Sequence, residues 1–336
     1  MRPFASSLPS EKKTGIVFVT AAVFLIFAAA FSLLCGSVRI SLSDAAGAIF
    51  NGPVGMGERI FLFSRLPRTL AAIIVGAALS VSGAVIQKVL ANGLASPGII
   101  GVNSGAGLAV TLCAAFGIYG GAALSLFSFL GALLATLVIS FGAWKWGNTR
   151  STVILMMGVA LNSVLGALSD SVIEFNPDIA AMSADFKIGD LSAASYGKLI
   201  PAFVAVAFCL AVLFLFSNEL DVLGMGDETA TGLGLNTKLF RAVFLVAAAL
   251  LAGCAVSIAG LVSFVGLVVP HAVRKICGAR AKTQLPLCAM IGAGFVTLCD
   301  TLARSLFSPY EIPVGIILAF VGAPLFVVIL IKGKGR

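Results

Sequence analysis

The sequence predicts an all-α membrane protein with about ten spanning helices, and its composition and its apolar runs support that fold class. Of its 336 residues, 60% are hydrophobic and 11% are charged, and the mean hydropathy is +1.10. A soluble domain has about a quarter of its residues charged, mostly on its surface. Most apolar side chains of this chain must therefore face lipid or one another.

The apolar runs give the individual helices, since a helix that crosses the hydrocarbon core needs roughly 20 apolar residues. Charged residues, glycine or proline bound ten such runs, at 15–35, 67–87, 98–117, 121–143, 151–171, 199–217, 239–259, 262–277, 285–306 and 312–331. The first run is long for a signal peptide and lacks a small-residue cleavage site, so we interpret it as an uncleaved helix.

Lysine and arginine predict how these spans are oriented, because both residues are enriched in cytoplasmic loops. Most of the 22 fall inside if both termini are cytoplasmic. Residues 1–336 then form one multi-pass domain, with an outer segment at 172–198 that has a possible short helix near 186–197. The longest inner loop, 218–237, is acidic, which topology does not explain. The net charge is +8, but the basic residues are scattered among apolar segments, so they do not indicate nucleic-acid binding.

Several kinds of chemistry have no matching motif. No phosphate-binding loop is present, so we do not expect this chain to hydrolyse ATP. The seven cysteines form no CxxC pair and His271 is the only histidine, which predicts no metal site and no bound cofactor. Asp170 and Asp300 lie near outer ends of spans, where we expect them to be hydrated. A stand-alone secondary carrier, which would need ionisable groups near the midplane, and a membrane-embedded enzyme remain as alternatives.

Seven short motifs carry a family resemblance. They are Arg65-Leu-Pro-Arg68, Gly76 to Gln87, Asn92 to Gly101, Leu223 to Gly234, Gly260 to His271, Glu311 to Gly315 and Gly322-Ala-Pro324. In this order and spacing they resemble the FecCD-like permeases of type II ABC importers, which take up iron–siderophore complexes, haem and cobalamin. The resemblance covers the chain from about residue 60 to its end. One departure is Gly93, where the family usually has proline.

The resemblance implies a permease subunit with the type II importer fold, not an enzyme, in a prokaryotic inner membrane. Its partners would be a second permease subunit, identical or homologous, two cytoplasmic ATPase subunits that use ATP and Mg²⁺, and an extracytoplasmic binding protein. Cargo would pass by alternating access between the two permeases. Iron–siderophore complexes are the first expectation, with cobalamin, haem or an oxyanion as alternatives.

The resemblance also assigns the acidic inner loop as the segment that couples the permease to the ATPase. The residues concerned are Gly226, Asp227, Glu228, Thr229, Ala230, Gly232, Leu233 and Gly234. Carboxylates stabilise the positive end of a helix. The two adjacent acidic residues therefore predict that a short helix begins at this point.

Further roles follow from the same resemblance. Arg65 and Arg304 are expected to receive carboxylates of the binding protein, whereas Arg68 has no equally clear role. Ser151 and Thr152 match a cytoplasmic gate. The remaining motif residues, for which we expect structural roles, are Asn92, Pro97, Gly266, Pro270 and His271. We expect Asn92 to cap backbone groups of its turn, and the Pro270–His271 pair to end a helix and supply an imidazole hydrogen bond.

Overall fold

The computed structural model describes residues 11–38, 40–50, 52–53, 55–145 and 151–331. Within these ranges the regular structure is entirely helical. The two ends of the predicted domain, 1–10 and 332–336, lie outside the described residues.

Each of the ten predicted spans coincides with a helix, which confirms the predicted fold class. The helices are α1 (Glu11–Leu34), α4 (Leu66–Val89), α5 (Val102–Ala115), α6 (Gly121–Lys145), α7 (Ser151–Phe175), α9 (Tyr196–Leu215), α12 (Thr237–Ala259), α13 (Val265–Cys277), α14 (Ala281–Ser305) and α15 (Val314–Ile331). Seven described helices are long and apolar enough to cross a membrane, and α5 and α15 are shorter apolar helices.

Two spans are shorter than predicted because backbone in the left-handed region interrupts them. The predicted span 98–117 starts as the 3-10 turn η2 (Pro97–Ile100), and Gly101 at φ +87° separates that turn from α5. The predicted span 262–277 becomes helical only at Val265, after Phe264 at φ +68°. At 1.5 Å per residue, α5 and α13 each cover about 20 Å, which is less than the hydrocarbon core of about 30 Å.

Short helices connect the spans. They are α2 (Leu42–Phe50), α3 (Met56–Ile60), the π-helical turn η1 (Phe61–Arg65), the 3-10 turn η3 (Pro177–Ile179), α8 (Ala180–Ile188), α10 (Ser217–Leu223) and α11 (Asp227–Gly232). The short helix expected near 186–197 is thus α8, which lies earlier because Gly189, at φ +81°, ends it. The loop predicted at 218–237 is largely helical.

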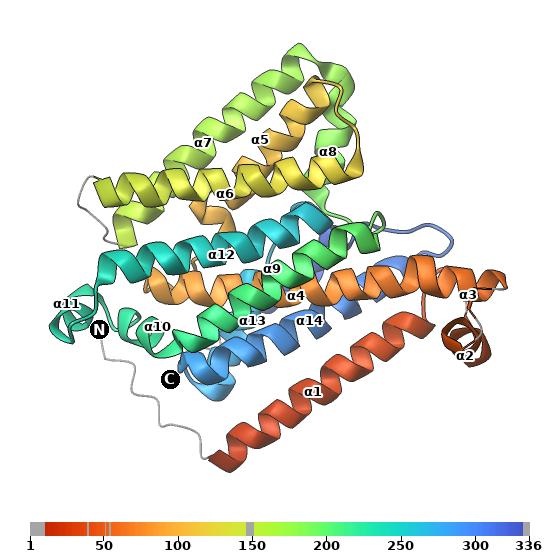
Figure 1. Ribbon diagram of the computed structural model, residues 1–336, viewed down its shortest axis with the longest axis horizontal. Coiled ribbons are helices and arrows are strands. Elements are labelled where there is room, and N and C mark those ends of the chain that lie inside the picture. The colour runs from red at the N-terminus through yellow and green to blue at the C-terminus, as the bar shows by residue number, and fades with distance from the viewer. Residues whose placement is uncertain (1–10, 39, 51, 54, 146–150, 332–336) are drawn as a thin grey trace.

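Helix α4 is the central helix of the fold, and α9, α12, α13, α14 and α1 pack around it (Figure 1). Glycines set its closest approaches. A Cβ atom at Gly83 would lie 1.8 Å from the carbonyl oxygen of Gly266, and one at Gly76 would lie 2.2 Å from that of Gly292. Backbones touch directly at both points, so these small residues are packing sites, as membrane helices commonly use them.

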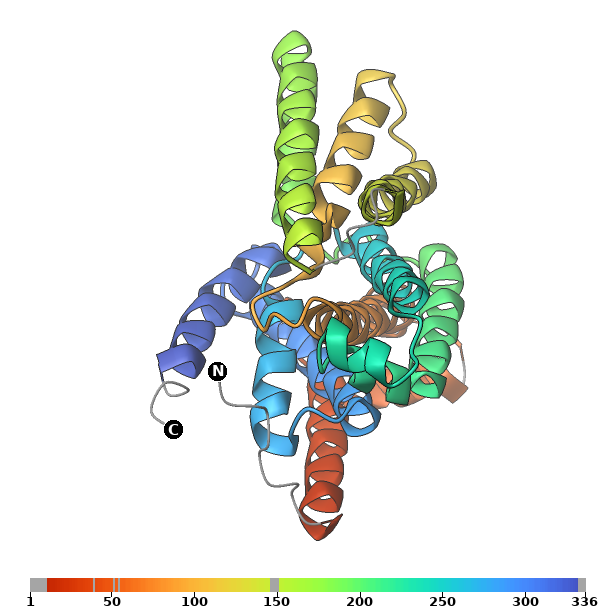
Figure 2. The same cartoon turned by 90° about the vertical axis from the view of Figure 1, so that its left-hand side faces the viewer.

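A second group of helices, α5 to α8, stands to one side of this bundle, and α1 lies at the opposite edge (Figure 2). Helix α7 is its outermost member, with only 11% of its most apolar stretch buried. Its backbone approaches the rest of the chain closely at Gly158, where an added Cβ would lie 2.1 Å from the carbonyl oxygen of Ile99. Most of α7 is therefore left free to face lipid or another subunit.

The elements at the two ends of the bundle differ. Helices α10 and α11 lie at one end, which we call the α11 end, and α2, α3 and α8 lie at the other, the α2 end (Figure 1). Each end carries a set of charged side chains, and these sets form the candidate site.

Candidate functional site

Helix α11 starts at Asp227, as the paired carboxylates predict, and an ion pair fixes it to α12. Gly226 enters the helix at φ +104°, a conformation that residues with side chains rarely adopt. The Asp227 carboxylate accepts hydrogen bonds from both terminal nitrogens of Arg241, one of them at 3.2 Å. Arg241 is buried in α12. The start of α11 is therefore tied to α12 by a buried guanidinium.

A second ion pair holds α10, the helix just before α11. Lys88, near the end of α4, donates to Asp221 of α10 and to the carbonyl oxygen of Ala279. The same Asp221 carboxylate accepts the amide of Ala281, the first residue of α14, at 2.8 Å and 3.0 Å. Three helices meet at this carboxylate, so α10 is attached to the centre of the fold.

The surface of α11 combines exposed apolar and acidic side chains. Met225 before the helix is 64% exposed and Leu233 after it is 65% exposed. Glu228 and Thr229 are also exposed, whereas Ala230 packs inward. Gly232 is exposed, and Gly234 at φ +82° turns the chain toward α12. A projecting helix with apolar residues at both ends can dock into a cleft on another protein.

A polar pocket of about 340 Å³ lies behind α11 and brings two predicted sites together. Gly226 to Thr229 form one wall, and Ser151, the first residue of α7, forms another. Thr152 is exposed and is not among the residues that line the pocket. The gate role of both residues stays a prediction, but Ser151 does lie directly beside the predicted coupling segment.

The turn at 92–97 connects α4 to η2. The Asn92 side chain accepts the amide of Leu94 at 2.9 Å, and its carbonyl oxygen accepts the amide of Ala95 at 3.1 Å. This is the capping contact expected of Asn92. Pro97 is buried as the first residue of η2. Gly93 stands in this turn at the position where the resemblance predicts proline.

The motif on α13 differs from its expected role. Pro270 does not end the helix, because α13 continues through it to Cys277. The Nδ1 atom of His271 has no hydrogen-bond partner among the described residues, and the ring instead packs edge-on against Phe326 at 6.3 Å. The polar contact here belongs to Gln87 of α4, which donates to the Gly266 carbonyl at 3.3 Å and accepts from Arg274.

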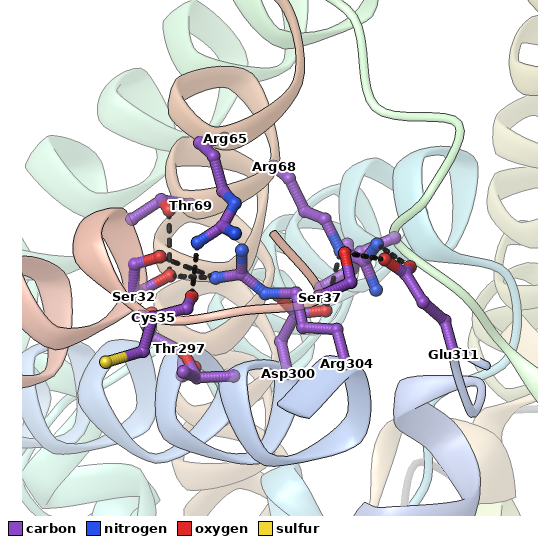
Figure 3. Close-up of polar contacts among 12 residues, drawn as sticks. Ser32, Cys35, Ser37, Arg65, Arg68, Thr69, Thr297, Asp300, Arg304 and Glu311 are labelled. Atoms are coloured by element: carbon purple, nitrogen blue, oxygen red, sulfur yellow. Dashed lines mark hydrogen bonds and ion pairs between the residues drawn. The ribbon is translucent and has the colours of Figure 1, made fainter. Parts of the chain in front are cut away.

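At the α2 end, Arg68 is the centre of a partly buried charge cluster (Figure 3). Its Nε donates to Asp300 at 3.0 Å and a terminal nitrogen donates to Glu311 at 2.5 Å. Asp190 lies 3.9 Å from the other terminal nitrogen. Arg68 thereby joins α4, α14 and the segments that precede α9 and α15.

Asp300 was expected to be hydrated, and that expectation is wrong. The side chain is 0% exposed and lies between Arg68 and Arg304, the latter with its Nε 3.2 Å from Oδ2. A buried carboxylate stays charged only where cations compensate its lost hydration. The i, i+4 spacing of Asp300 and Arg304 was the available sequence signal. Asp170 is exposed as expected and pairs with Lys187.

Arg65 and Arg304 both lie at the α2 end, but their guanidinium groups point inward. They are 3% and 2% exposed. Arg304 donates to the carbonyl and hydroxyl oxygens of Ser32, and Arg65 donates to the carbonyls of Cys35 and Val38. Both guanidinium groups therefore bind oxygens of this chain in this conformation. Docking to a partner stays a prediction, and it requires Arg65 to leave Cys35 and Val38 and Arg304 to leave Ser32.

Comparison with known proteins identifies the family of this chain. The family model described as the FecCD transport family matches residues 24–332. The chain belongs to the FecCD transport family. It is 33% identical over 95% of its length to the iron(3+)-hydroxamate import system permease FhuG of Bacillus subtilis, covering 98% of that protein. It is 34% identical to the ferric enterobactin permease FepD of Escherichia coli, with 96% of this chain and 99% of that protein covered.

A solved structure supports the same assignment. It is described as an inward-facing conformation of a metal-chelate type ABC transporter, is 29% identical, and aligns with a TM-score of 0.85 over 95% of this chain and 99% of that one. As a FecCD-family chain, this protein is a multi-pass membrane permease of bacterial ABC importers, a transport component and not an enzyme. The motifs at 65–68 and 223–234 thus supply the residues that organise the two ends.

Proposed function

We propose that this chain is the permease subunit of an ATP-driven importer for iron–siderophore complexes. The names of its relatives support the cargo, since they refer to iron(3+)-hydroxamate and ferric enterobactin. A relative from Yersinia pestis, 35% identical, is named for hemin, so haem is the first alternative and cobalamin or an oxyanion follow. The observation that carries the proposal is the exposed helix α11, anchored to α12 through the Asp227–Arg241 ion pair.

In this proposal the α11 end faces the cytoplasm, as do both termini. A cytoplasmic ATPase subunit grips α11 between Met225 and Leu233, and ATP and Mg²⁺ act in that partner. Nucleotide-driven closure pulls α11, and the Asp227–Arg241 and Lys88–Asp221 pairs pass the movement to α12, α4 and α14. The cargo pathway lies between this chain and a second permease subunit, and Ser151 and Thr152 close its cytoplasmic side.

The α2 end faces outward and receives the binding protein. Arg65 and Arg304 lie just beneath that surface, and their guanidinium forks bind carboxylates bidentately once Ser32 and residues 35–38 move aside. The conservative change Arg65→Lys keeps the charge and loses the fork. We expect it to weaken binding-protein affinity while the yield of folded permease stays unchanged, and an unchanged affinity at low salt would remove this assignment.

The coupling proposal is tested with Leu233→Glu in cells that co-express the cognate ATPase. We expect the ATPase to stop copurifying, because a charge replaces the exposed apolar contact. The matched control is Leu306→Glu, which changes a leucine that is 59% exposed at the α2 end. If both variants retain the ATPase equally and its hydrolysis rate is unchanged, α11 is not the coupling helix.

The cargo proposal is tested by uptake of radiolabelled iron into cells that lack the chain and are complemented with it. Ferric hydroxamate or ferric catecholate chelates should accumulate, whereas haem and labelled cobalamin should not. Uptake that depends on haem or cobalamin instead would correct the cargo and keep the machinery. Uptake that persists on an ion gradient without the ATPase would identify a secondary carrier.

A further inference from the structure

A large apolar pocket lies outside both ends of the candidate site, between the first turns of α6 and α9. Its volume is about 830 Å³, and α12 forms its floor through Cys254 and Ser257. Figure 1 shows α6 and α9 on either side of α12, and both pack against it. Only 28% of the most apolar stretch of each of these two helices is buried, so the pocket opens among lipid-facing surfaces.

The walls of this α6–α9 pocket are apolar in effect. Ser125 on α6 donates its hydroxyl to the carbonyl of Gly121, and Ser257 on α12 donates to that of Cys254. Both hydroxyls are thus satisfied within their own helices. The other residues along its depth are mainly alanine, leucine, phenylalanine and proline. Such a space fits a hydrocarbon chain better than a polar solute.

One cationic side chain marks the mouth of the pocket. Lys198, in the first turn of α9, lines it and has no carboxylate within ion-pair distance among the described residues. Its Nζ lies above Gly121, 3.4 Å from where a Cβ atom on that glycine would be. Ser195, the N-cap residue of α9, also lies at the mouth, and its side chain makes no capping hydrogen bond to α9. The mouth is therefore positive, and none of the described residues supplies an anion to it.

The pocket depth matches one leaflet of a bilayer. From Gly121 to Phe129 on α6 the helix rises about 12 Å, and half of the hydrocarbon core is about 15 Å. Both helices begin at the mouth, which sets Lys198 near the depth of the lipid headgroups. A lysine ammonium at this depth can form a charge-assisted hydrogen bond with a lipid phosphate.

We propose that the α6–α9 pocket holds one anionic phospholipid, with an acyl chain between α6 and α9 and its phosphate against the Lys198 ammonium. The proposal extends beyond cargo transport and does not depend on which cargo is carried. A bound lipid fills a gap that α6 and α9 leave over α12. It thereby holds the second helix group against the central bundle.

The experiment titrates the purified full-length chain with phosphatidylglycerol and with phosphatidylcholine and measures bound lipid by native mass spectrometry. The unchanged protein should bind phosphatidylglycerol more tightly. Lys198→Ala should weaken phosphatidylglycerol about fivefold, the effect expected for one lysine near an anionic headgroup. Lys145→Ala, which removes a lysine at the other end of α6, is the matched control and should change nothing.

A second variant, Ala205→Trp, fills the pocket and should weaken both lipids. Equal affinity for phosphatidylglycerol in the Lys198→Ala and Lys145→Ala proteins would overturn the proposal. So would displacement of the lipid by millimolar inorganic phosphate, because the site would then bind a free anion. If no lipid is retained and Ala205→Trp alters the oligomeric state, the pocket is a protein interface and the proposal is wrong.

Discussion

The Arg68 cluster gives the sharpest test of how this fold is stabilised. We expect Arg68→Met to destabilise the protein strongly, because it removes the nearest cation from Asp300, which is fully buried. Removing one partner of a buried ion pair costs roughly 3–5 kcal/mol. Arg304 remains 3.2 Å from the other carboxylate oxygen, so Asp300 keeps one partner. The expected cost therefore lies at the lower end, at about 3 kcal/mol.

The assay is equilibrium unfolding in mixed detergent micelles, with Lys187→Met as the control. Lys187 also pairs with an aspartate, at 3.3 Å, but both side chains are well exposed. Exposed pairs of this kind contribute less than about 1 kcal/mol. The double variant Arg68→Met with Asp300→Leu should cost less than the sum of its single changes, because no charge is then left unpaired between these two positions. If Arg68→Met costs no more than Lys187→Met, the buried cluster does not stabilise the fold.

Three further predictions concern the backbone and the pH response. Gly83→Ala should destabilise the protein by about 1–3 kcal/mol, the usual cost of overpacking. Gly107→Ala is the control and should not destabilise it, because nothing lies within 4 Å of the added Cβ atom. Equal unfolding curves for the two variants would refute the close approach of α4 to Gly266. Gly226→Ala should leave folding intact but lower ATPase stimulation severalfold, since its φ of +104° would be strained by roughly 1–3 kcal/mol, and full stimulation would contradict the role of this turn. Burial raises the pKa of Glu311, but the hydrogen bond and charge of Arg68 outweigh burial and hold that pKa below its ordinary value. The ionised form is thus stabilised by folding, so stability present above about pH 4.5 should be lost as the pH falls through the lowered pKa, and Glu311→Gln should flatten this dependence in unfolding titrations.

Hydropathy predicted the spans well because every helix that crosses the bilayer needs a run of about 20 apolar residues. It could not predict where α5 and α13 begin, since Gly101 and Phe264 adopt left-handed backbone that only the packed fold enforces. The start of α11 was predictable because adjacent carboxylates at Asp227 and Glu228 act locally on the helix that they open. Pro270 was misjudged, because the rule that proline ends helices weakens where neighbouring helices satisfy the freed groups.

The charge cluster was beyond the sequence for a different reason. Arg68 and Asp300 are separated by 232 positions, and no local pattern links them. The family resemblance pointed to Arg65 and Arg304, whereas the structure gives the largest set of ionic contacts to Arg68. In the sequence, the spacing of Asp300 to Arg304 is the only sign that Asp300 is buried.

The same separation has a consequence for biogenesis. Translation proceeds at about 5–20 residues per second, so Asp300 emerges from the ribosome roughly 10–50 s after Arg68. During that interval α4 already carries Arg68, but Asp300, its most deeply buried counter-ion, has not yet been synthesised. We expect α4 to reach its final depth in the bilayer only when α14 has been inserted. The insertion of α4 is then completed by a helix that is synthesised much later.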